Sequence, residues 1–122
     1  MTSLTISDVA AETGLTTSTL RYYEQEGLLL APIGRASSSH RRYTEQDLRW
    51  VEFVTRLRST GMPIRDIRRY AELARGGDQT AADRLALLVD HRERVQEQLR
   101  EMRRSLAAIE FKIETYERLI TK

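Results

Sequence analysis

Arginine is the residue of this chain best suited to chemistry, because it is abundant and gathers in one stretch. Of the 20 basic residues, only Lys112 and Lys122 are lysines. The segment 35–69 holds nine arginines and four acidic residues, an excess of five positive charges, whereas the whole chain has a formal net charge of +2. Arginine binds phosphate groups and guanine edges through paired hydrogen bonds. The clustering therefore predicts a polyanionic partner, and nucleic acid is the first candidate.

No set of residues in the sequence fits a catalytic or metal site. The chain has no cysteine, which excludes disulfides, thiolate metal ligands and thiol redox switches. It contains no His-x-x-x-His pattern, no Gly-x-Ser-x-Gly, no phosphate-binding loop and no clustered pair of carboxylates. We therefore expect a protein that is not an enzyme and that carries no metal and no cofactor.

The sequence also bears on location. No apolar run approaches the roughly 20 residues that span a bilayer, and the first five residues show no secretion signal. We expect a cytoplasmic protein with no membrane partner.

Two short helices near the N-terminus must position part of the basic surface. The first is predicted over residues 5–13 and the second over residues 17–26, with Gly14 in the turn between them. Two helices joined by such a turn form a helix-turn-helix. In the second helix Leu20 and Tyr23 are spaced to face the core. The opposite, outward face then carries side chains suited to a DNA groove, namely Ser18, Arg21, Tyr22 and Gln25.

The following elements are marked by turn residues and by helix-start signals. Residues 28–43 contain proline, glycine and three serines, which predicts a basic hairpin. One further helix is expected from Thr44 to Gly61 and another from Pro63 to Arg75, before the break at residues 76–77. Threonine followed three residues later by aspartate predicts helix starts at Thr5/Asp8, Thr44/Asp47 and Thr80/Asp83.

The last segment has a heptad pattern. Eleven positions, spaced alternately by three and four residues, hold ten apolar residues, and Arg92 is the exception. This is the pattern of a coiled-coil seam. A helix of this length, roughly 60 Å, is too long for the head to bury, so we expect a second copy of the chain to pack against it. The predicted homodimer interface consists of Leu85, Leu88, Val95, Leu99, Met102, Leu106, Ile109, Ile113 and Tyr116.

Four separate motifs carry a family resemblance over residues 4–119. They are Thr19-Leu20-Arg21-Tyr22-Tyr23-Glu24, Gly27-Leu28-Leu29, Arg41-Arg42-Tyr43-Thr44-Glu45-Gln46-Asp47-Leu48 and Leu57-Arg58-Ser59-Thr60-Gly61-Met62-Pro63-Ile64. With this order of elements the chain resembles the MerR family of transcription regulators, and most of all its short, cysteine-free members linked to aldehyde, alcohol and stress responses.

The resemblance implies a mostly α-helical fold. A winged helix-turn-helix DNA-binding domain with a small β-hairpin wing would span residues 1–77, and an antiparallel coiled-coil dimerisation helix would span residues 78–122. The homodimer would bind a pseudo-palindromic promoter operator in double-stranded DNA, bend and untwist it, and thereby act on RNA polymerase indirectly. The implied DNA contacts are Thr17, Ser18, Arg21 and Tyr22 in the second helix, Arg35, His40, Arg41 and Tyr43 in the first wing, and Arg65, Arg68 and Arg69 in the second wing.

The sequence departs from the family pattern at the wing tip and at the C-terminal end. Ser39-His40-Arg41 stands where Gly-Tyr-Arg is common, and the metal-binding cysteines are absent. We expect no separate sensor domain. Any effector, whose identity is unknown, would bind between the head and the long helix, where Tyr70, Leu73, Leu88 and His91 are the candidate lining residues. Plain packing of these four residues is the alternative. Two other functions stay open: an architectural DNA-bending protein without promoter choice, and a coiled-coil interaction adaptor.

Overall fold

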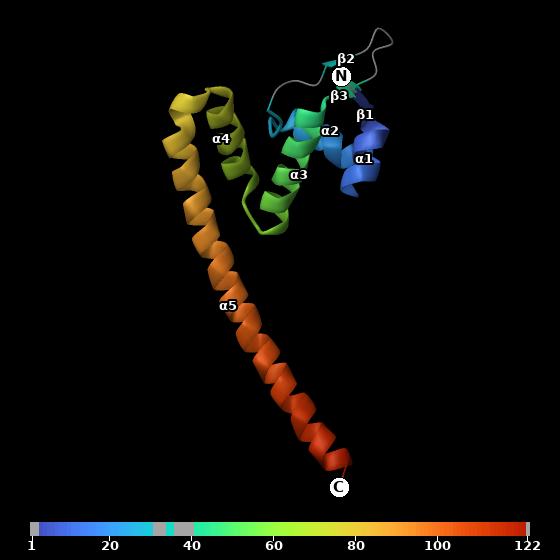
Figure 1. Cartoon of the computed structure of the whole chain (residues 1–122), viewed down its shortest axis with the longest axis vertical. Helices are drawn as coiled ribbons and strands as arrows, with labels where there is room; N and C mark the ends of the chain where they lie inside the picture. The colour runs from blue at the N-terminus through green and yellow to red at the C-terminus, as the bar shows by residue number, and fades with distance from the viewer. Residues whose placement is uncertain (1–2, 31–33, 36–40, 122) are drawn as a thin grey trace. The chain divides into compact units, whose positions relative to one another are not determined.

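The computed structural model describes residues 3–30, 34–35 and 41–121 (Figure 1). Two compact units are present, Met1–Leu87 and Leu88–Lys122. Our predicted division at 77/78 follows the end of α4, whereas the compact units divide within the long helix, after Leu87. Among the helices of the described part of the chain, none is long and apolar enough to cross a membrane.

The chain begins with the helix-turn-helix. Helix α1 spans Ile6–Thr13 and helix α2 spans Thr17–Gln25. Thr5 and Asp8 form a complete capping box at the start of α1, and the Thr16 hydroxyl accepts from the Thr19 N–H at the start of α2. Gly14 ends α1 with φ of 74°, a left-handed conformation that side chains disfavour. The predicted pair of helices and the turn between them are thereby confirmed.

A small antiparallel sheet accompanies these helices. Its strands are β1 (Leu4–Thr5), β2 (Gly34–Arg35) and β3 (Arg41–Tyr43), in the order β1-β3-β2. The predicted hairpin is the pair β2 and β3, in which Arg35 is opposite Arg41. Strand β1 was not predicted, because two residues show no periodicity and their partner, β3, lies almost forty residues away in the sequence. Thr5 therefore both pairs with Arg42 and caps α1.

Two longer helices complete the core of the first unit. Helix α3 (Glu45–Ser59) starts with the predicted capping box of Thr44 and Asp47, and helix α4 (Ile64–Arg75) follows Pro63. Their inward residues join those of α1, α2 and the sheet. The largest fully buried side chains are Tyr43, Leu20, Leu28, Met62, Ile67, Val9, Val51 and Val54. The buried stripe of α4 consists of Ile67, Tyr70, Ala71 and Leu73.

A short 3-10 helix, η1 (Asp78–Thr80), leads into the long helix α5 (Ala81–Ile120). The Thr80 hydroxyl bonds to the carbonyl oxygens of Leu73 and Gly77, at 2.5 and 2.8 Å. Thr80 thus lies at the predicted helix start. Its hydroxyl, however, bonds to carbonyls that precede α5, because η1 brings those carbonyls close. The predicted architecture, a winged helix-turn-helix head followed by a long C-terminal helix, is confirmed.

Candidate nucleic-acid interface

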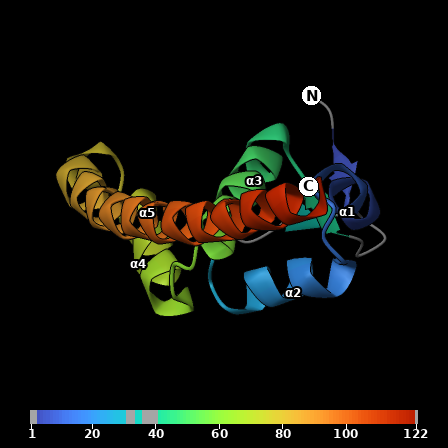
Figure 2. The ribbon, with the colours of Figure 1, turned by 90° about the horizontal axis from the view of Figure 1, so that it is seen from below.

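Helix α2 presents a polar face to solvent. Leu20 and Tyr23 are buried, as their spacing predicted, whereas Ser18 and Arg21 are exposed and Tyr22 is 42% exposed. Thr17 is half-buried. Figure 2 shows α2 at the lower edge of the first unit, with one face turned away from the other elements. An exposed helix face with an arginine and a tyrosine has the shape and the donors that a DNA major groove accepts.

Side chains of α3 and α4 hold the segment that follows α2. The Arg68 Nε donates to the Glu26 carbonyl at 2.8 Å, and the Trp50 indole N–H donates to the Leu28 carbonyl at 2.8 Å. Arg75 donates to three more carbonyls, those of Gly27, Leu29 and Leu30, at 2.9, 2.6 and 3.0 Å. Every carbonyl from residue 26 to residue 30 therefore accepts a side-chain hydrogen bond.

These contacts attach the C-terminal end of α2 to the rest of the unit, because carbonyls at a helix end otherwise lack partners. We call Trp50, Arg68 and Arg75 the α2 clamp. Trp50 and Arg75 were not predicted in this role, since their partners are backbone atoms of a distant segment. No sequence motif marks such a pairing.

Arg68 differs from its neighbours among the predicted phosphate contacts. Its Nη2 lies 2.7 Å from the Glu26 carboxylate, so two of its donors, on Nε and Nη2, bond to the residue at the end of α2. Arg65 is 84% exposed and Arg69 is exposed as well. Arg65 and Arg69 are thus accessible to an external anion, with Arg65 at a long 3.9 Å from the Asp66 carboxylate. Arg68 is 39% exposed and is partly engaged within the protein.

Of the four predicted wing contacts, Arg35, Arg41 and Tyr43 are among the residues that the structure describes. Arg35 and Arg41 face each other in the backbone register of β2 and β3. His40 lies outside the described residues, so its predicted DNA contact stays a prediction. Tyr43 is fully buried. Since alternate residues of a strand point to opposite faces, Tyr43 turns into the core beneath the wing, and our prediction that its side chain contacts DNA is wrong.

The base of the wing is electrostatically linked to α1. The pKa of Asp8 is lowered from its ordinary value of 3.8, first because the Thr5 backbone N–H donates to the carboxylate, at 2.9 Å, and then because the Thr5 hydroxyl bonds it. The positive charge of Arg42 on β3 lowers this pKa further. The wing strand and the first helix therefore meet at Asp8.

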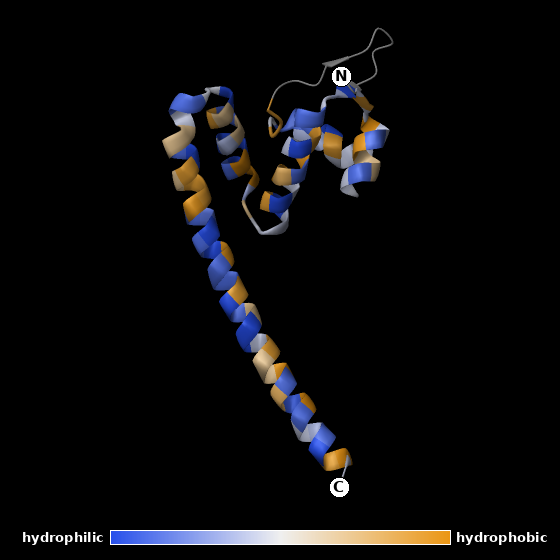
Figure 3. Cartoon of the chain, in the orientation of Figure 1, coloured by the Kyte–Doolittle hydropathy of each residue, from blue (hydrophilic) through white to orange (hydrophobic). Residues whose placement is uncertain are grey.

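The second unit, the part of α5 from Leu88 onward, exposes an apolar stripe. Exposed fractions along the predicted seam are 47% for Leu99, 70% for Met102, 57% for Ile109 and 58% for Tyr116. Figure 3 shows hydrophobic residues recurring along α5 between charged ones. Outside the seam, Glu97 pairs with Arg100 at 2.6 Å, which lowers the pKa of Glu97. A single chain thus leaves uncovered the surface that a coiled coil would bury.

The four predicted effector-site residues fall into both units. Tyr70 and Leu73 are buried on α4 in the first unit, and Leu88 and His91 begin the second. His91 is buried, with 6% exposure. That these four residues form an effector pocket stays a prediction.

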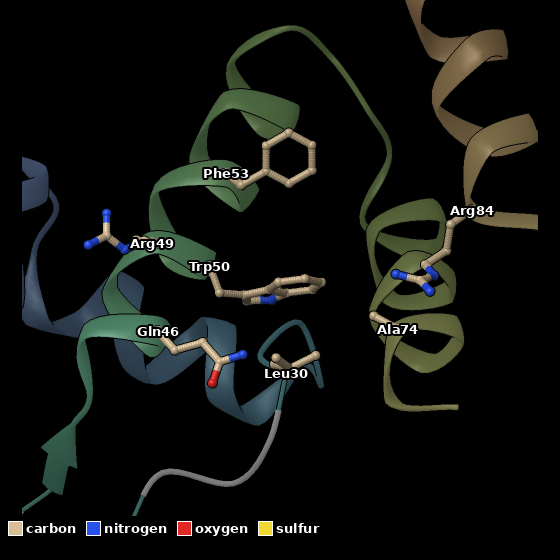
Figure 4. Close-up of a pocket in the computed structure, with 7 residues that line it drawn as sticks. All are labelled: Leu30, Gln46, Arg49, Trp50, Phe53, Ala74 and Arg84. Atoms are coloured by element: carbon tan, nitrogen blue, oxygen red, sulfur yellow. The ribbon is translucent and has the colours of Figure 1, made fainter. Parts of the chain in front are cut away.

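One of the pockets within the first unit is lined partly by aromatic side chains. Its volume is about 400 Å³. Side chains of α3, α4 and the first turns of α5 line it, together with Leu30, as Figure 4 shows. Among the described residues, no group of three or more histidine, aspartate or glutamate side chains is placed to hold a metal ion.

Models of two protein families match the chain. The MerR HTH family regulatory protein model matches residues 4–73, and the model named MerR, DNA binding, matches residues 48–119. Proteins of this family are transcription regulators and not enzymes, which confirms the expectation of a non-enzymatic protein.

Individual relatives agree with the family models. The chain is 37% identical to an HTH-type transcriptional regulator of Haemophilus influenzae over 93% of this chain and 84% of the relative. It is 40% identical to the HTH-type transcriptional regulator AdhR of Bacillus subtilis over 75% of this chain, and the match covers 65% of AdhR.

Two solved structures resemble the fold closely. The crystal structure of HiNmlR, a MerR family regulator lacking the sensor domain and bound to promoter DNA, matches with a TM-score of 0.86 and 36% identity, over 96% of this chain and 92% of that one. A putative MerR family regulator from Listeria monocytogenes matches with a TM-score of 0.87 and 33% identity, over 93% and 86% of the two chains. With matches to both family models and to these relatives, the chain belongs to the MerR family of DNA-binding transcription regulators.

Proposed function

We propose that this chain binds a promoter operator in double-stranded DNA as a homodimer and regulates transcription by bending and untwisting that DNA. The observation that carries the proposal is the outward face of α2, where Arg21 is exposed and Tyr22 is 42% exposed while Leu20 anchors the helix in the core. Such a face carries donors that can contact base edges in the major groove. The complex of the similar regulator HiNmlR with promoter DNA supports this reading.

Each proposed contact has a separate task. Thr17, Ser18, Arg21 and Tyr22 would meet the major groove, and the wing arginines Arg35 and Arg41, with His40, would meet the flanking backbone. Arg65 and Arg69 would bind phosphates beyond the wing. Phosphate contacts position a protein on DNA, whereas base contacts select the sequence.

Dimerisation would place two heads on one operator. The exposed seam of α5 supports a coiled coil with a second copy, in the antiparallel orientation that the family resemblance implies. A twofold dimer requires an operator with two inverted half-sites, hence a pseudo-palindrome. RNA polymerase would respond indirectly, to the shape of the promoter. Because the relatives are bacterial regulators and bacterial DNA lies in the cytoplasm, we propose a cytoplasmic location.

A footprint on the DNA upstream of the protein's own gene tests this function. We expect protection of an inverted repeat, competition by that operator and weak competition by bulk DNA. Arg21→Ala should weaken the footprint, so that more protein is needed for protection, and Arg94→Ala, which removes an exposed arginine of α5 outside the seam, should leave it unchanged. Equal competition by bulk DNA would favour an architectural DNA-bending protein. No DNA binding at all would favour a coiled-coil adaptor.

A further inference from the structure

The pocket of the first unit has an aromatic wall on α3. Trp50 and Phe53 form this wall, and Leu30 and Ala74 extend it (Figure 4). Tyr70 stacks on Trp50, with ring centroids 5.5 Å apart and planes 12° apart. Phe53 is 37% exposed. Because Tyr70 packs against both the Trp50 and the Phe53 rings, the wall is a preformed apolar surface of the kind that holds small molecules.

The polar residues of the pocket favour an anion. They are Gln46, Arg49 and Arg84, and none of the lining residues is acidic. The Arg84 and Gln46 side chains extend toward the space in front of Trp50, whereas the Arg49 guanidinium turns away from it (Figure 4). Arg84 donates to the Thr80 hydroxyl at 3.1 Å and to the Gly77 carbonyl at 3.0 Å. These two bonds hold a guanidinium, which pairs well with carboxylates, at the edge of an apolar pocket.

The size of the pocket limits the ligand. A volume of about 400 Å³ lies at the lower end of the range found for small-molecule sites. It suits one aromatic ring with a short substituent. A carboxylate on that ring would reach Arg84 while the ring lies against Trp50.

We propose that this pocket binds a small aromatic carboxylate, with the ring against Trp50 and Phe53 and the carboxylate on Arg84. The assignment of that ligand as a regulator of DNA binding rests on the proposed function above; the binding site itself does not. This site lies against Trp50, on which the predicted effector residue Tyr70 stacks.

The pocket shares residues with the α2 clamp. The Trp50 N–H donates to the Leu28 carbonyl, and Leu30, a wall residue, accepts from Arg75. A ligand in contact with Trp50 and Leu30 therefore touches the segment that attaches α2 to α3 and α4. A ligand that binds one arrangement of this segment more tightly shifts the protein toward it. The same shift changes how α2 is presented to DNA.

Fluorescence gives a direct test, because Trp50 is the only tryptophan of the chain. The full-length protein without DNA is titrated with para-tert-butylbenzoate, and in parallel with the matching benzyl alcohol and benzylamine. These three probes share one apolar body and differ in charge. We expect a saturable change in Trp50 emission with the acid, about tenfold weaker binding of the alcohol, and still weaker binding of the amine.

Two variants and one control locate the site. Arg84→Gln should lower the affinity for the acid about tenfold and leave the affinity for the alcohol unchanged, because only the charge pair is lost. Ala74→Leu, which fills part of the pocket, should lower the affinity for both the acid and the alcohol. Arg58→Gln removes an exposed arginine at the end of α3 that does not line the pocket, and it should change neither affinity. Circular dichroism and thermal unfolding establish that each variant is folded.

Three results would overturn the proposal: no saturable fluorescence response of the folded wild type, equal affinity for the acid and the amine, or unchanged acid affinity in folded Arg84→Gln. The link to DNA is measured separately, as operator affinity with and without the acid. Acid binding without any operator binding would refute the proposed function and leave the site standing. Operator binding without a fluorescence response of Trp50 to the acid would refute the site and leave the proposed function standing.

Discussion

Arg68 joins helix α4 to the end of helix α2 through two hydrogen bonds to one residue, Glu26. Its Nε donates to the Glu26 carbonyl at 2.8 Å, and its Nη2 lies 2.7 Å from the Glu26 carboxylate. Glu26 is the residue at which α2 ends. The helix with the outward polar face is therefore attached at this end by an arginine that the sequence motif alone would assign to phosphate binding.

The role of Arg68 can be separated from that of Arg65 by salt dependence. We expect Arg65→Ala to weaken binding on all DNA sequences and to reduce the salt slope by about one unit, because an exposed phosphate contact is lost. Arg68→Ala should lower the free energy of unfolding by about 1 kcal/mol, since the pair with Glu26 is partly exposed, and leave the salt slope unchanged. Urea unfolding and binding at several salt concentrations measure both. A reduced slope in Arg68→Ala would restore Arg68 as a phosphate contact.

Two tyrosines form a matched pair for a second prediction. Tyr43 is fully buried and Tyr22 is 42% exposed. Tyr43→Ala should lower the free energy of unfolding by about 3–5 kcal/mol, because it leaves a cavity in the core. Tyr22→Ala should change it by less than about 0.5 kcal/mol and should weaken operator binding. Urea unfolding and operator titrations of both variants check this, and a stable Tyr43→Ala protein with impaired DNA binding would reverse our correction.

A third prediction concerns the seam of α5. Leu99→Asp would place a charge in the coiled-coil interface, where it has no partner and little water. We expect monomers or unfolded chains at concentrations where the wild type sediments as a dimer. Gln98→Asp introduces the same charge beside the seam and should leave the dimer intact. A wild type that sediments as a stable monomer at micromolar concentration would refute the assignment of the seam as a dimer interface.

A fourth prediction distinguishes contacts with bases, which select the DNA sequence, from contacts with phosphates, which do not. Arg21→Ala should lose on the order of 1–3 kcal/mol of discrimination at one operator position, because an arginine commonly contacts a guanine with two hydrogen bonds. Competition with operators mutated one base pair at a time measures this loss. Arg65→Ala serves as the control and should keep the ranking of the operators. An identical ranking for Arg21→Ala and the wild type would remove Arg21 from the base contacts.

Acid should weaken the junction between α1 and the wing. The pKa of Asp8 is lower in the folded protein than its ordinary value of 3.8, mainly through the hydrogen bond from the Thr5 backbone N–H. A carboxyl group with a lowered folded pKa adds stability above its unfolded pKa, and this stability is lost as the pH falls through the folded value. The difference in unfolding free energy between the wild type and Asp8→Asn should therefore shrink from about pH 5 to about pH 3. A constant difference over that interval would show that the Asp8 carboxylate adds nothing.

The order of elements could be predicted from the sequence because its signals are local. Capping residues such as Thr5 and Thr44 lie three residues from their partners, and Gly14 ends α1 by its own conformation. The inward and outward faces of α2 follow from helical periodicity, so Leu20 and Arg21 were assigned correctly as buried and exposed. The seam of α5 is a repeat within one segment and needs no tertiary information.

Contacts between distant segments depended on the tertiary structure alone. The sequence could not show that Arg75 donates to three carbonyls after α2, because backbone acceptors carry no residue-specific signal. Nor could the sequence show that Tyr43 turns inward. Its orientation follows from the pairing of β3 with β1, and β1 is only two residues long. Trp50 was an unremarked residue of a helix until the fold placed its N–H on Leu28 and its ring against Tyr70. Local chemistry thus determined the elements and their exposed faces, and only packing between them decided which side chains hold the DNA-binding helix in place.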